Sequence, residues 1–145
     1  MITRPRFGGA FRFFRRRTHN SALAKKGADM TEAQEQEAVI RWCDWSRIPV
    51  YHIPNGGKRN VAEAAHLKRL GVRAGVPDLC IPVARGRYHS LYVEMKSGRG
   101  KPTEKQAEWI EHLGRLGHCA IVCNGSEQAI DDIRRYMLLP PNGEF

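Results

Sequence analysis

An α/β layer fold is the architecture that the sequence predicts for residues 30–145. Segments with helical periodicity alternate there with short apolar segments, in the order helix, strand, helix, strand, strand, helix, strand, helix, which is typical of helices packed on a sheet. Glycine and proline separate most of these segments and mark the turns. With 145 residues, 41% of them hydrophobic, the chain suits one globular domain. It has no apolar run of the roughly 18 residues that span a bilayer, so we expect a non-membrane protein.

The first helix is expected to run from Thr31 to about Trp45. Thr31 is a good N-cap residue, and Gln34 stands three positions later, which is the spacing of a capping box. Apolar residues then recur at helical intervals, at Ala33, Val39, Ile40 and Cys43. Pro49 breaks this pattern, so we expect a short strand to follow over Val50–Ile53.

Two strands joined by a tight turn are expected in the middle of the chain. Residues 54–59, with the sequence PNGGKR, have the turn chemistry of a loop, and a helix is expected over 61–70. Strands are expected over 79–83 and 91–95, because both segments are apolar and bounded by turn residues. The turn between them falls at 85–87, with the sequence RGR.

The last third of the chain is expected to add a helix, a strand and a second helix. The first of these helices begins at Thr103 or the residue before it, and the strand covers Cys119–Cys123. Ser126 is expected to cap the last helix, which ends near Met137.

The cysteines favour packing over metal binding. Cys119 and Cys123 alternate with Ile121 along the expected strand, so all three side chains lie on one face. The alternative is a zinc ion held by Cys119 and Cys123 with His112 and His118. The paired ligand spacings of structural zinc sites are missing, so we expect buried thiols.

Basic residues are concentrated at the start of the chain. Residues 1–29 contain eight bases and one acid, a net charge of +7, whereas residues 30–145 contain sixteen bases and fourteen acids, a net charge of +2. Basic segments bind polyanions by releasing counterions. Three interpretations of residues 1–29 stay open: a disordered nucleic-acid-binding arm, an organellar transit peptide, and a segment that precedes a true translation start at Met30.

Three charged residues in the strand region indicate phosphodiester chemistry. Glu94 and Lys96 lie on one face of their strand, because side chains alternate, and Asp78 begins the preceding strand, where antiparallel pairing would bring it beside Glu94. Two carboxylates offer the hard oxygen ligands that Mg²⁺ prefers, and a bound metal lowers the pKa of a water nucleophile. A lysine can orient or deprotonate that water, or neutralise charge on the phosphate oxygens. The alternative is an ordinary solvated ion pair on a surface strand.

With their neighbours, these residues resemble the VRR-NUC family of PD-(D/E)XK nucleases. The resemblance rests on GVPDL at 75–79 and VEMK at 93–96, and it extends to Thr31, Glu32 and Gln36, to HIPNGG at 52–57 and to TEKQ at 103–106. It covers about residues 31–123. It implies a restriction-endonuclease-like core, with a central mixed β-sheet of about four strands flanked by helices, in a nuclease domain over residues 30–145.

The resemblance also implies roles for the residues of the strands. Asp78 and Glu94 would bind Mg²⁺ or Mn²⁺, and the backbone carbonyl of Met95 could add a ligand. Lys96 would assist the attacking water. Gln106 matches a glutamine that the family places near the site.

The first helix offers more than one residue for the same site. The family carries Glu or Gln there, in support of the metal shell. Glu32 and Gln36 lie one turn apart on one face, and Glu35 is the competing acid. An acid at a helix start is also common simply because it suits the helix dipole.

Basic and polar loop residues are expected to contact DNA. Asn55, Lys58 and Arg59 lie in the glycine-containing loop, and Arg99 and Lys101 follow the strand that carries Lys96. For each of them, an ordinary solvated loop is the alternative.

The aromatic and imidazole side chains are given structural interpretations. Trp42, Trp45 and Trp109 fit helix faces and are expected in the core or at an interface rather than as base-stacking platforms. His52 and the other histidines of the domain lack metal-pair spacing, so we interpret them as structural or surface residues.

The function that the resemblance implies is metal-dependent cleavage of DNA by a bacterial or phage-encoded enzyme in the cytoplasm. Stand-alone members of the family resemble Holliday-junction resolvases, so branched DNA is the expected substrate and a homodimer would place two sites on two strands. One alternative is a catalytically inactive nucleic-acid-binding module on the same fold. Another is a basic RNA-binding or assembly protein that works through residues 1–29.

Overall fold

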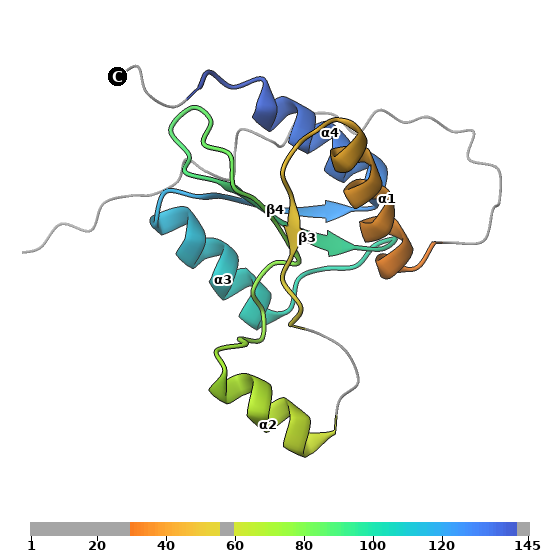
Figure 1. Ribbon diagram of the computed structural model, residues 1–145, viewed down its shortest axis with the longest axis vertical. Helices are drawn as coiled ribbons and strands as arrows, with labels where there is room; N and C mark the ends of the chain where they lie inside the picture. The colour runs from red at the N-terminus through yellow and green to blue at the C-terminus, as the bar shows by residue number, and fades with distance from the viewer. Residues whose placement is uncertain (1–29, 56–59, 142–145) are drawn as a thin grey trace, which may run out of the picture.

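The computed structural model describes residues 30–55 and 60–141, and within these ranges it contains four helices and four strands (Figure 1). In chain order they are α1 (Glu32–Trp45), β1 (Tyr51–His52), α2 (Val61–Arg69), β2 (Leu79–Ile81), β3 (Leu91–Lys96), α3 (Glu104–Arg115), β4 (Cys119–Asn124) and α4 (Ser126–Met137). The expected α/β fold is confirmed. No helix in the described ranges is long and apolar enough to cross a membrane.

The four strands form one mixed sheet in the order β1-β2-β3-β4. β1 pairs with β2 and β2 with β3 in antiparallel fashion, whereas β3 and β4 are parallel. A parallel pair needs a long crossover, and α3 supplies it. The expected turn between β2 and β3 is present, closed by two backbone hydrogen bonds between Arg85 and Tyr88 of 3.1 and 2.9 Å.

The core lies mainly between the sheet and the helices α1 and α4. These two helices lie together over one side of the sheet, and α3 packs against β4 on the other side (Figure 1). Both faces of β3 are buried or nearly so. Apolar residues of α1, α4 and all strands but β1 make up the cluster: Val39, Cys43, Leu79, Ile81, Leu91, Val93, Met95, Cys119, Cys123, Ala129, Ile133 and Tyr136.

Cys119 and Cys123 behave as the strand pattern predicts. Both are buried, and Ile121 packs against the same core. Burial raises the pKa of the Cys119 thiol to about 12, and the charge of Asp132 adds to the shift.

Ends of several elements differ from the prediction. β1 and β2 are shorter than the expected segments 50–53 and 79–83. The expectation that Ser126 caps the last helix is wrong, because Gly125 occupies the N-cap position with a φ of 88° and offers no side chain. The cap comes from α1 instead, where Oε2 of Glu35 accepts a hydrogen bond of 2.7 Å from the Ser126 N–H.

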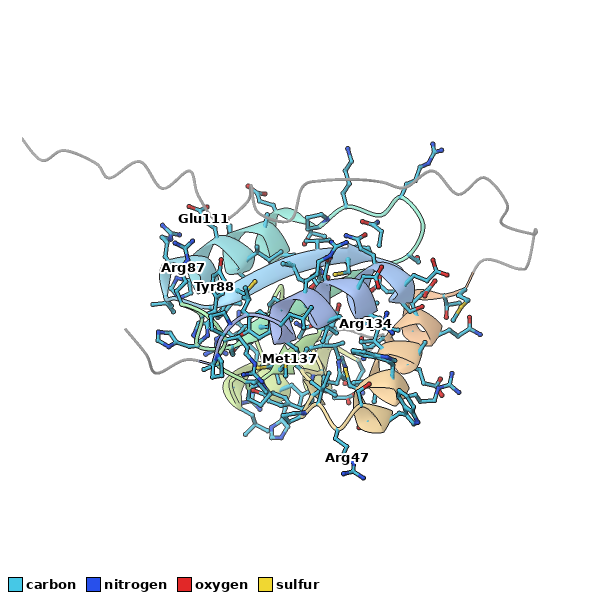
Figure 2. All side chains as sticks on the ribbon, turned by 90° about the horizontal axis from the view of Figure 1, so that it is seen from above. Arg47, Arg87, Tyr88, Glu111, Arg134 and Met137 are labelled. Atoms are coloured by element: carbon cyan, nitrogen blue, oxygen red, sulfur yellow. The ribbon has the colours of Figure 1, made fainter. Side chains whose placement is uncertain are left out.

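The tryptophans occupy three different environments. Trp42 packs against the core, and the guanidinium of Arg134, on α4 where it faces α1 in Figure 2, lies 5.1 Å from its ring centroid. Trp45 is 83% exposed, so of the two places expected for it, the core is excluded and an interface stays a prediction. Trp109 is half-buried and lines a cleft beside α2. The helix α2 lies apart from the sheet (Figure 1) and contains no buried residue.

Candidate active site

The polar residues singled out in the sequence meet at the end of β3. Glu94 is 1% exposed and Lys96 is 9% exposed, although both belong to a strand that is otherwise apolar. Two ionisable groups in such a place are costly unless they have partners. The first turns of α1 and α3 supply those partners.

Strand register brings Asp78 beside Glu94. Leu79 pairs with Val93 in the antiparallel ladder, so continuing the same register by one residue places Asp78 opposite Glu94 and on the same face. Oδ2 of Asp78 accepts a hydrogen bond of 2.8 Å from the Met95 N–H. The carboxylate of Asp78 is thereby held against the backbone of β3 at the position where Glu94 and Lys96 emerge.

Lys96 lies between two carboxylates. Its Nζ donates a hydrogen bond of 2.7 Å to Oε1 of Glu94 and lies 3.8 Å from Oε2 of Glu32. Glu32 is the first residue of α1, so the start of that helix reaches the end of β3. Its side chain is 48% exposed, which leaves the site open to solvent on this side.

Gln106 connects the cap of α3 to Glu94. Its Oε1 accepts a hydrogen bond of 2.8 Å from the Thr103 N–H, which completes a capping box. Its Nε2 donates a hydrogen bond to Oε1 of Glu94. One side chain therefore starts a helix and fixes a site carboxylate, which explains why a capping glutamine occurs at this position.

Gln36 reaches the site through His52, one of the histidines for which the sequence favours a structural or surface role. Nδ1 of His52 lies 2.8 Å from the Asp78 carbonyl oxygen and 3.1 Å from Nε2 of Gln36. Because a carbonyl oxygen only accepts, Nδ1 carries its hydrogen toward Asp78. The signal that identifies His52 in the sequence is its place in the motif at 52–57.

Glu35, the competing acid of the first helix, does not join the site. Its carboxylate faces the N-terminus of α4 and accepts the Ser126 N–H. The structure therefore brings Glu32 to Lys96 and directs Glu35 to a helix cap.

Asn55 is one of the residues expected to contact DNA. The Asn55 side-chain amide donates a hydrogen bond to the Val76 carbonyl, so it braces the segment before Asp78. The expected contacts of Lys58 and Arg59 lie outside the described residues.

Arg99 and Lys101 are exposed on the loop that follows β3. Asn124 holds this loop, because its side-chain amide donates to the carbonyls of Gly98 and Gly100 at 3.0 and 2.9 Å. The two cations thus lie on a braced loop that begins directly after Lys96.

Burial and like charges raise the pKa of Glu94 to about 7. Desolvation is the main cause, and the charges of Asp78 and Glu32 add to it, while the hydrogen bond from Lys96 opposes it. Desolvation lowers the pKa of Lys96, but the hydrogen bond and charge of Glu94 outweigh it and the net shift is upward. The site therefore has an excess of negative charge around one ammonium.

A divalent cation fits this donor set. Oε2 of Glu94 is buried and has no hydrogen-bond partner, and an orphaned carboxylate oxygen is costly without a cation. Among the described residues, no group of three or more His, Cys, Asp and Glu side chains surrounds a single point. The protein thus offers two carboxylates, and Mg²⁺ commonly binds to one or two carboxylates and completes its octahedron with waters and phosphate oxygens.

Comparisons with known proteins identify the family of the domain. The model of the VRR-NUC domain family matches residues 30–127, which include every described residue of the site. A solved structure titled "VRR_NUC domain protein" is 37% identical, with a TM-score of 0.69, and the match covers 81% of this chain and 94% of that chain. The comparison with curated proteins gave no match. The chain belongs to the VRR-NUC family of nuclease domains.

Proposed function

We propose that the protein is a metal-dependent DNA endonuclease whose catalytic residues are Asp78, Glu94 and Lys96. The observation that carries the proposal is the buried carboxylate of Glu94, which has Lys96 on one oxygen and no partner on the other. A merely structural ion pair does not explain the second oxygen or the adjacent carboxylate of Asp78. Ligation of a cation explains both.

Asp78 and Glu94, with the Met95 carbonyl as a further ligand, would hold Mg²⁺ or Mn²⁺. When bound, the metal supplies Lewis-acid activation of the phosphate and lowers the pKa of a coordinated water. The hydrogen bond from the Met95 N–H fixes one oxygen of Asp78, and Gln106 and Lys96 fix one oxygen of Glu94. The two carboxylates are thereby preorganised.

Lys96 acts as an ammonium in this proposal. Its pKa is raised because of Glu94 and the nearby acids, so it stays protonated at neutral pH and is poorly suited to remove a proton from water. A fixed ammonium at this position orients the water and neutralises charge that develops on the phosphate oxygens. The raised pKa of Lys96 therefore favours this electrostatic role over removal of a proton from water.

Three further residues position these groups. Gln106 holds the carboxylate of Glu94, and Glu32 lies beside the ammonium of Lys96. Gln36 acts at one remove, next to the histidine that binds the Asp78 carbonyl. Their support for the metal shell is direct for Gln106 and indirect for the two residues of α1.

The proposed substrate is branched DNA, such as a Holliday junction, cut by a homodimer with one site for each strand. The family resemblance supports this proposal, as does the small size of the domain, which leaves little surface for reading a base sequence. Arg99 and Lys101 follow the site on the chain and would contact phosphates, as would Asn55, Lys58 and Arg59.

Cleavage of four-way junction, flap and linear DNA in Mg²⁺, Mn²⁺ or EDTA tests the function. We expect cutting with either metal and none in EDTA, with a fall of at least about 100-fold for Asp78→Asn and Glu94→Gln, since loss of one well-placed group at an active site commonly has an effect of this size. Equal cutting by the wild type and both variants would show a contaminant and overturn the assignment. Tight DNA binding with no cutting in any metal would instead support the inactive binding module.

A further inference from the structure

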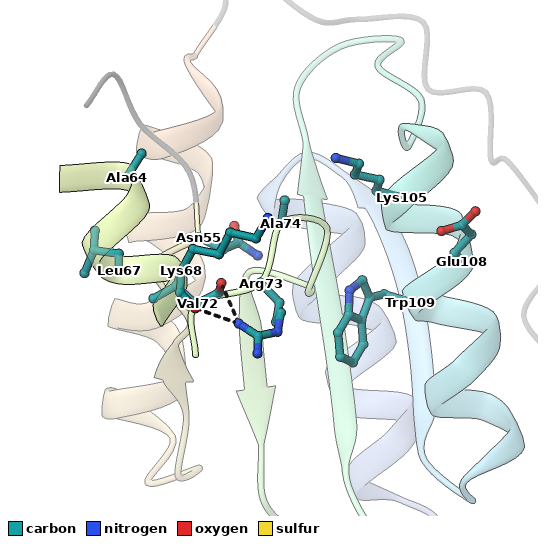
Figure 3. A pocket seen from close by; sticks show the side chains of 10 residues that line it. All are labelled: Asn55, Ala64, Leu67, Lys68, Val72, Arg73, Ala74, Lys105, Glu108 and Trp109. Carbon is teal, nitrogen blue, oxygen red and sulfur yellow. Dashed lines mark hydrogen bonds between the residues drawn. The ribbon is translucent and has the colours of Figure 1, made fainter. Parts of the chain in front are cut away.

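An open cleft of about 570 Å³ lies between α2 and α3 (Figure 3). It does not contain the catalytic residues, and nothing in the proposed reaction uses it. Its walls combine cations, an indole and aliphatic side chains, and the residues that matter most are Leu67, Lys68, Arg73, Lys105 and Trp109.

We propose that this cleft binds the single-stranded segment of a branched DNA substrate such as a flap, adjacent to the position at which the duplex is cut. The proposal rests on the proposed nuclease function, and it assigns to that enzyme a subsite for unpaired nucleotides. Trp109 stacks on a base, and the three cations contact the phosphates.

Charge complementarity favours a polyanion in the cleft. Lys68, Arg73 and Lys105 are exposed and line it, against a single acid, Glu108. In the described part of the chain, none of the three cations forms an ion pair. Exposed ammonium and guanidinium groups that face one opening are the usual binding partners of a phosphate backbone.

Arg73 is held in place without being neutralised. Its Nη1 donates hydrogen bonds of 2.9 and 3.3 Å to the carbonyls of Lys68 and Val72, at the end of α2 (Figure 3). These bonds use one nitrogen of the guanidinium and leave its positive charge and remaining donors for a ligand. A planar group fixed in this way is suited to a phosphate.

Trp109 provides the stacking surface. Its ring is half-buried on α3 and lines the cleft, and His112 meets it edge to face, with ring centroids 5.7 Å apart. Ala64, Leu67 and Val72 form the apolar side of the opposite wall. A tryptophan held between helices, in a cleft that also contains cations, is the combination that binds unpaired bases with little sequence preference.

The size of the cleft suits unpaired nucleotides. A volume of 570 Å³ lies in the range of pockets for single small ligands, which is enough for one or two unpaired nucleotides. This size is one reason why the proposal assigns single-stranded rather than double-stranded DNA to the cleft.

Two backbone connections join the cleft to the catalytic residues. Gly75 has a φ of +92°, and a Cβ atom there would lie 2.7 Å from the carbonyl carbon and oxygen of Lys105, so only glycine lets this loop pack on α3. The loop that contains Arg73 then leads directly to Asp78. On the opposite wall, Lys105 precedes Gln106, which binds Glu94. Each wall of the cleft is thus continuous in the chain with a residue of the candidate active site.

Binding of labelled DNA in EDTA tests the subsite without any need for cleavage. The probes are a fluorescein-labelled oligothymidylate of about ten nucleotides and a blunt duplex of the same length, measured by anisotropy with the full chain. We expect Trp109→Ala to weaken binding of the single strand at least about fivefold, the minimum for loss of one stacked base, and to change duplex binding by less than about twofold. Trp45→Ala is the matched control, since that indole is 83% exposed and lies outside the cleft; it should change neither affinity.

A second variant, which removes charge from the cleft, tests the subsite even if Trp109→Ala does not fold. The double variant Lys68→Ala, Lys105→Ala removes two exposed cations. The measured quantity is the slope of log affinity against log salt concentration for the single strand. The magnitude of this slope should fall by about 1.4. Arg115→Ala, an exposed cation of α3 outside the cleft, should leave the slope unchanged. If both cleft variants bind the single strand as the wild type does, or lose affinity for both probes equally, the subsite is overturned.

Asp78→Asn separates this inference from the proposed function. It should abolish cutting and still bind the single strand like the wild type, since it leaves the cleft intact. An enzyme that cuts normally while both cleft variants bind normally has no subsite here and remains a nuclease. A protein that never cuts, yet loses single-strand binding in Trp109→Ala, has the subsite without the nuclease activity.

Discussion

Glu94 is a residue at which stability and the proposed function conflict. It is 1% exposed, and burial raises its pKa to about 7 from an ordinary value of 4.5. The folded protein without metal therefore holds a proton at this position more tightly than the unfolded chain does. A residue chosen only for stability would be apolar here, as its neighbours Val93 and Met95 are.

The raised pKa of Glu94 predicts how the stability of the metal-free protein depends on pH. The contribution of this group is complete below pH 4.5, and it is lost as the pH rises through about 7. Between pH 5 and 8 the loss amounts to about 2 to 3 kcal/mol. Lys96 stays protonated over this range because its pKa is raised.

Urea unfolding of the wild type and Glu94→Gln in EDTA at pH 5 and pH 8 measures this loss. Glutamine cannot ionise, so the stability of the variant relative to the wild type should rise by that amount between the two pH values. Comparing the variant with the wild type cancels the contributions of other groups, such as His118, whose pKa is lowered by burial and by the charge of His89. Parallel pH profiles for the two proteins would contradict the prediction.

At the scale of elements, the two acids at the start of α1 have separate tasks. Glu32 faces the ammonium of Lys96, whereas Glu35, one turn later, accepts the first free N–H of α4. Gly125 has no side chain with which to cap α4, so α1 supplies the cap across the tertiary structure. An anion there also suits the dipole of α4.

Substitution of Glu35 should therefore affect stability, whereas substitution of Glu32 should affect the cleavage rate. We expect Glu35→Ala to lower the free energy of unfolding by about 0.5 to 2 kcal/mol, as loss of an N-cap does, and to retain the cleavage rate. Glu32→Ala should lower the cleavage rate with little change in stability, because its side chain is half exposed and belongs to the site. Chemical unfolding and a junction-cleavage assay on both variants decide the matter.

Glu37→Ala is the control for both substitutions, since this residue is an exposed acid of the same helix. It should behave as the wild type does in both measurements. A loss of activity in Glu35→Ala without a loss of stability would contradict the assignment and indicate that Glu35, not Glu32, belongs to the site.

At the scale of the whole molecule, the site joins elements that are far apart in the chain. The start of α1, the residue before β2, the end of β3 and the first turn of α3 all contribute to it. A cation bound by Asp78 and Glu94 would therefore link these elements and stabilise the folded state as a whole. Anything that binds only the folded state shifts the unfolding equilibrium in this way.

Thermal unfolding with and without divalent metal measures this linkage. At a metal concentration about 100 times the dissociation constant, the expected gain is about 2.7 kcal/mol, seen as a higher Tm in Mg²⁺ or Mn²⁺ than in EDTA. Asp78→Asn should abolish the gain. Lys96→Met should preserve it, because the lysine is not a ligand in the proposal. An equal rise in Tm for the wild type and Asp78→Asn would mean that the metal binds elsewhere.

Local patterns account for much of what the sequence predicted correctly. The capping box of Thr31 and Gln34 begins α1 as expected, and the alternation in β3 places Glu94 and Lys96 on the same face. These features depend on neighbours within a few residues, so they can be identified without knowledge of the fold. The expectation that Ser126 caps α4 is wrong because the cap depends on a distant residue. The Ser126 N–H is capped by a side chain of α1 that lies 91 residues away in the chain.

The sequence by itself determined the order of the elements, the α/β class and the charged residues of the candidate site, because periodicity, caps and short motifs are properties of a continuous segment. Only the tertiary structure decided which acid of α1 reaches Lys96, that His52 binds the Asp78 carbonyl, and that Trp109 faces a cleft instead of the core. Each of these outcomes depends on how separate elements pack. Packing is set by contacts between residues distant in the chain, which no local pattern records.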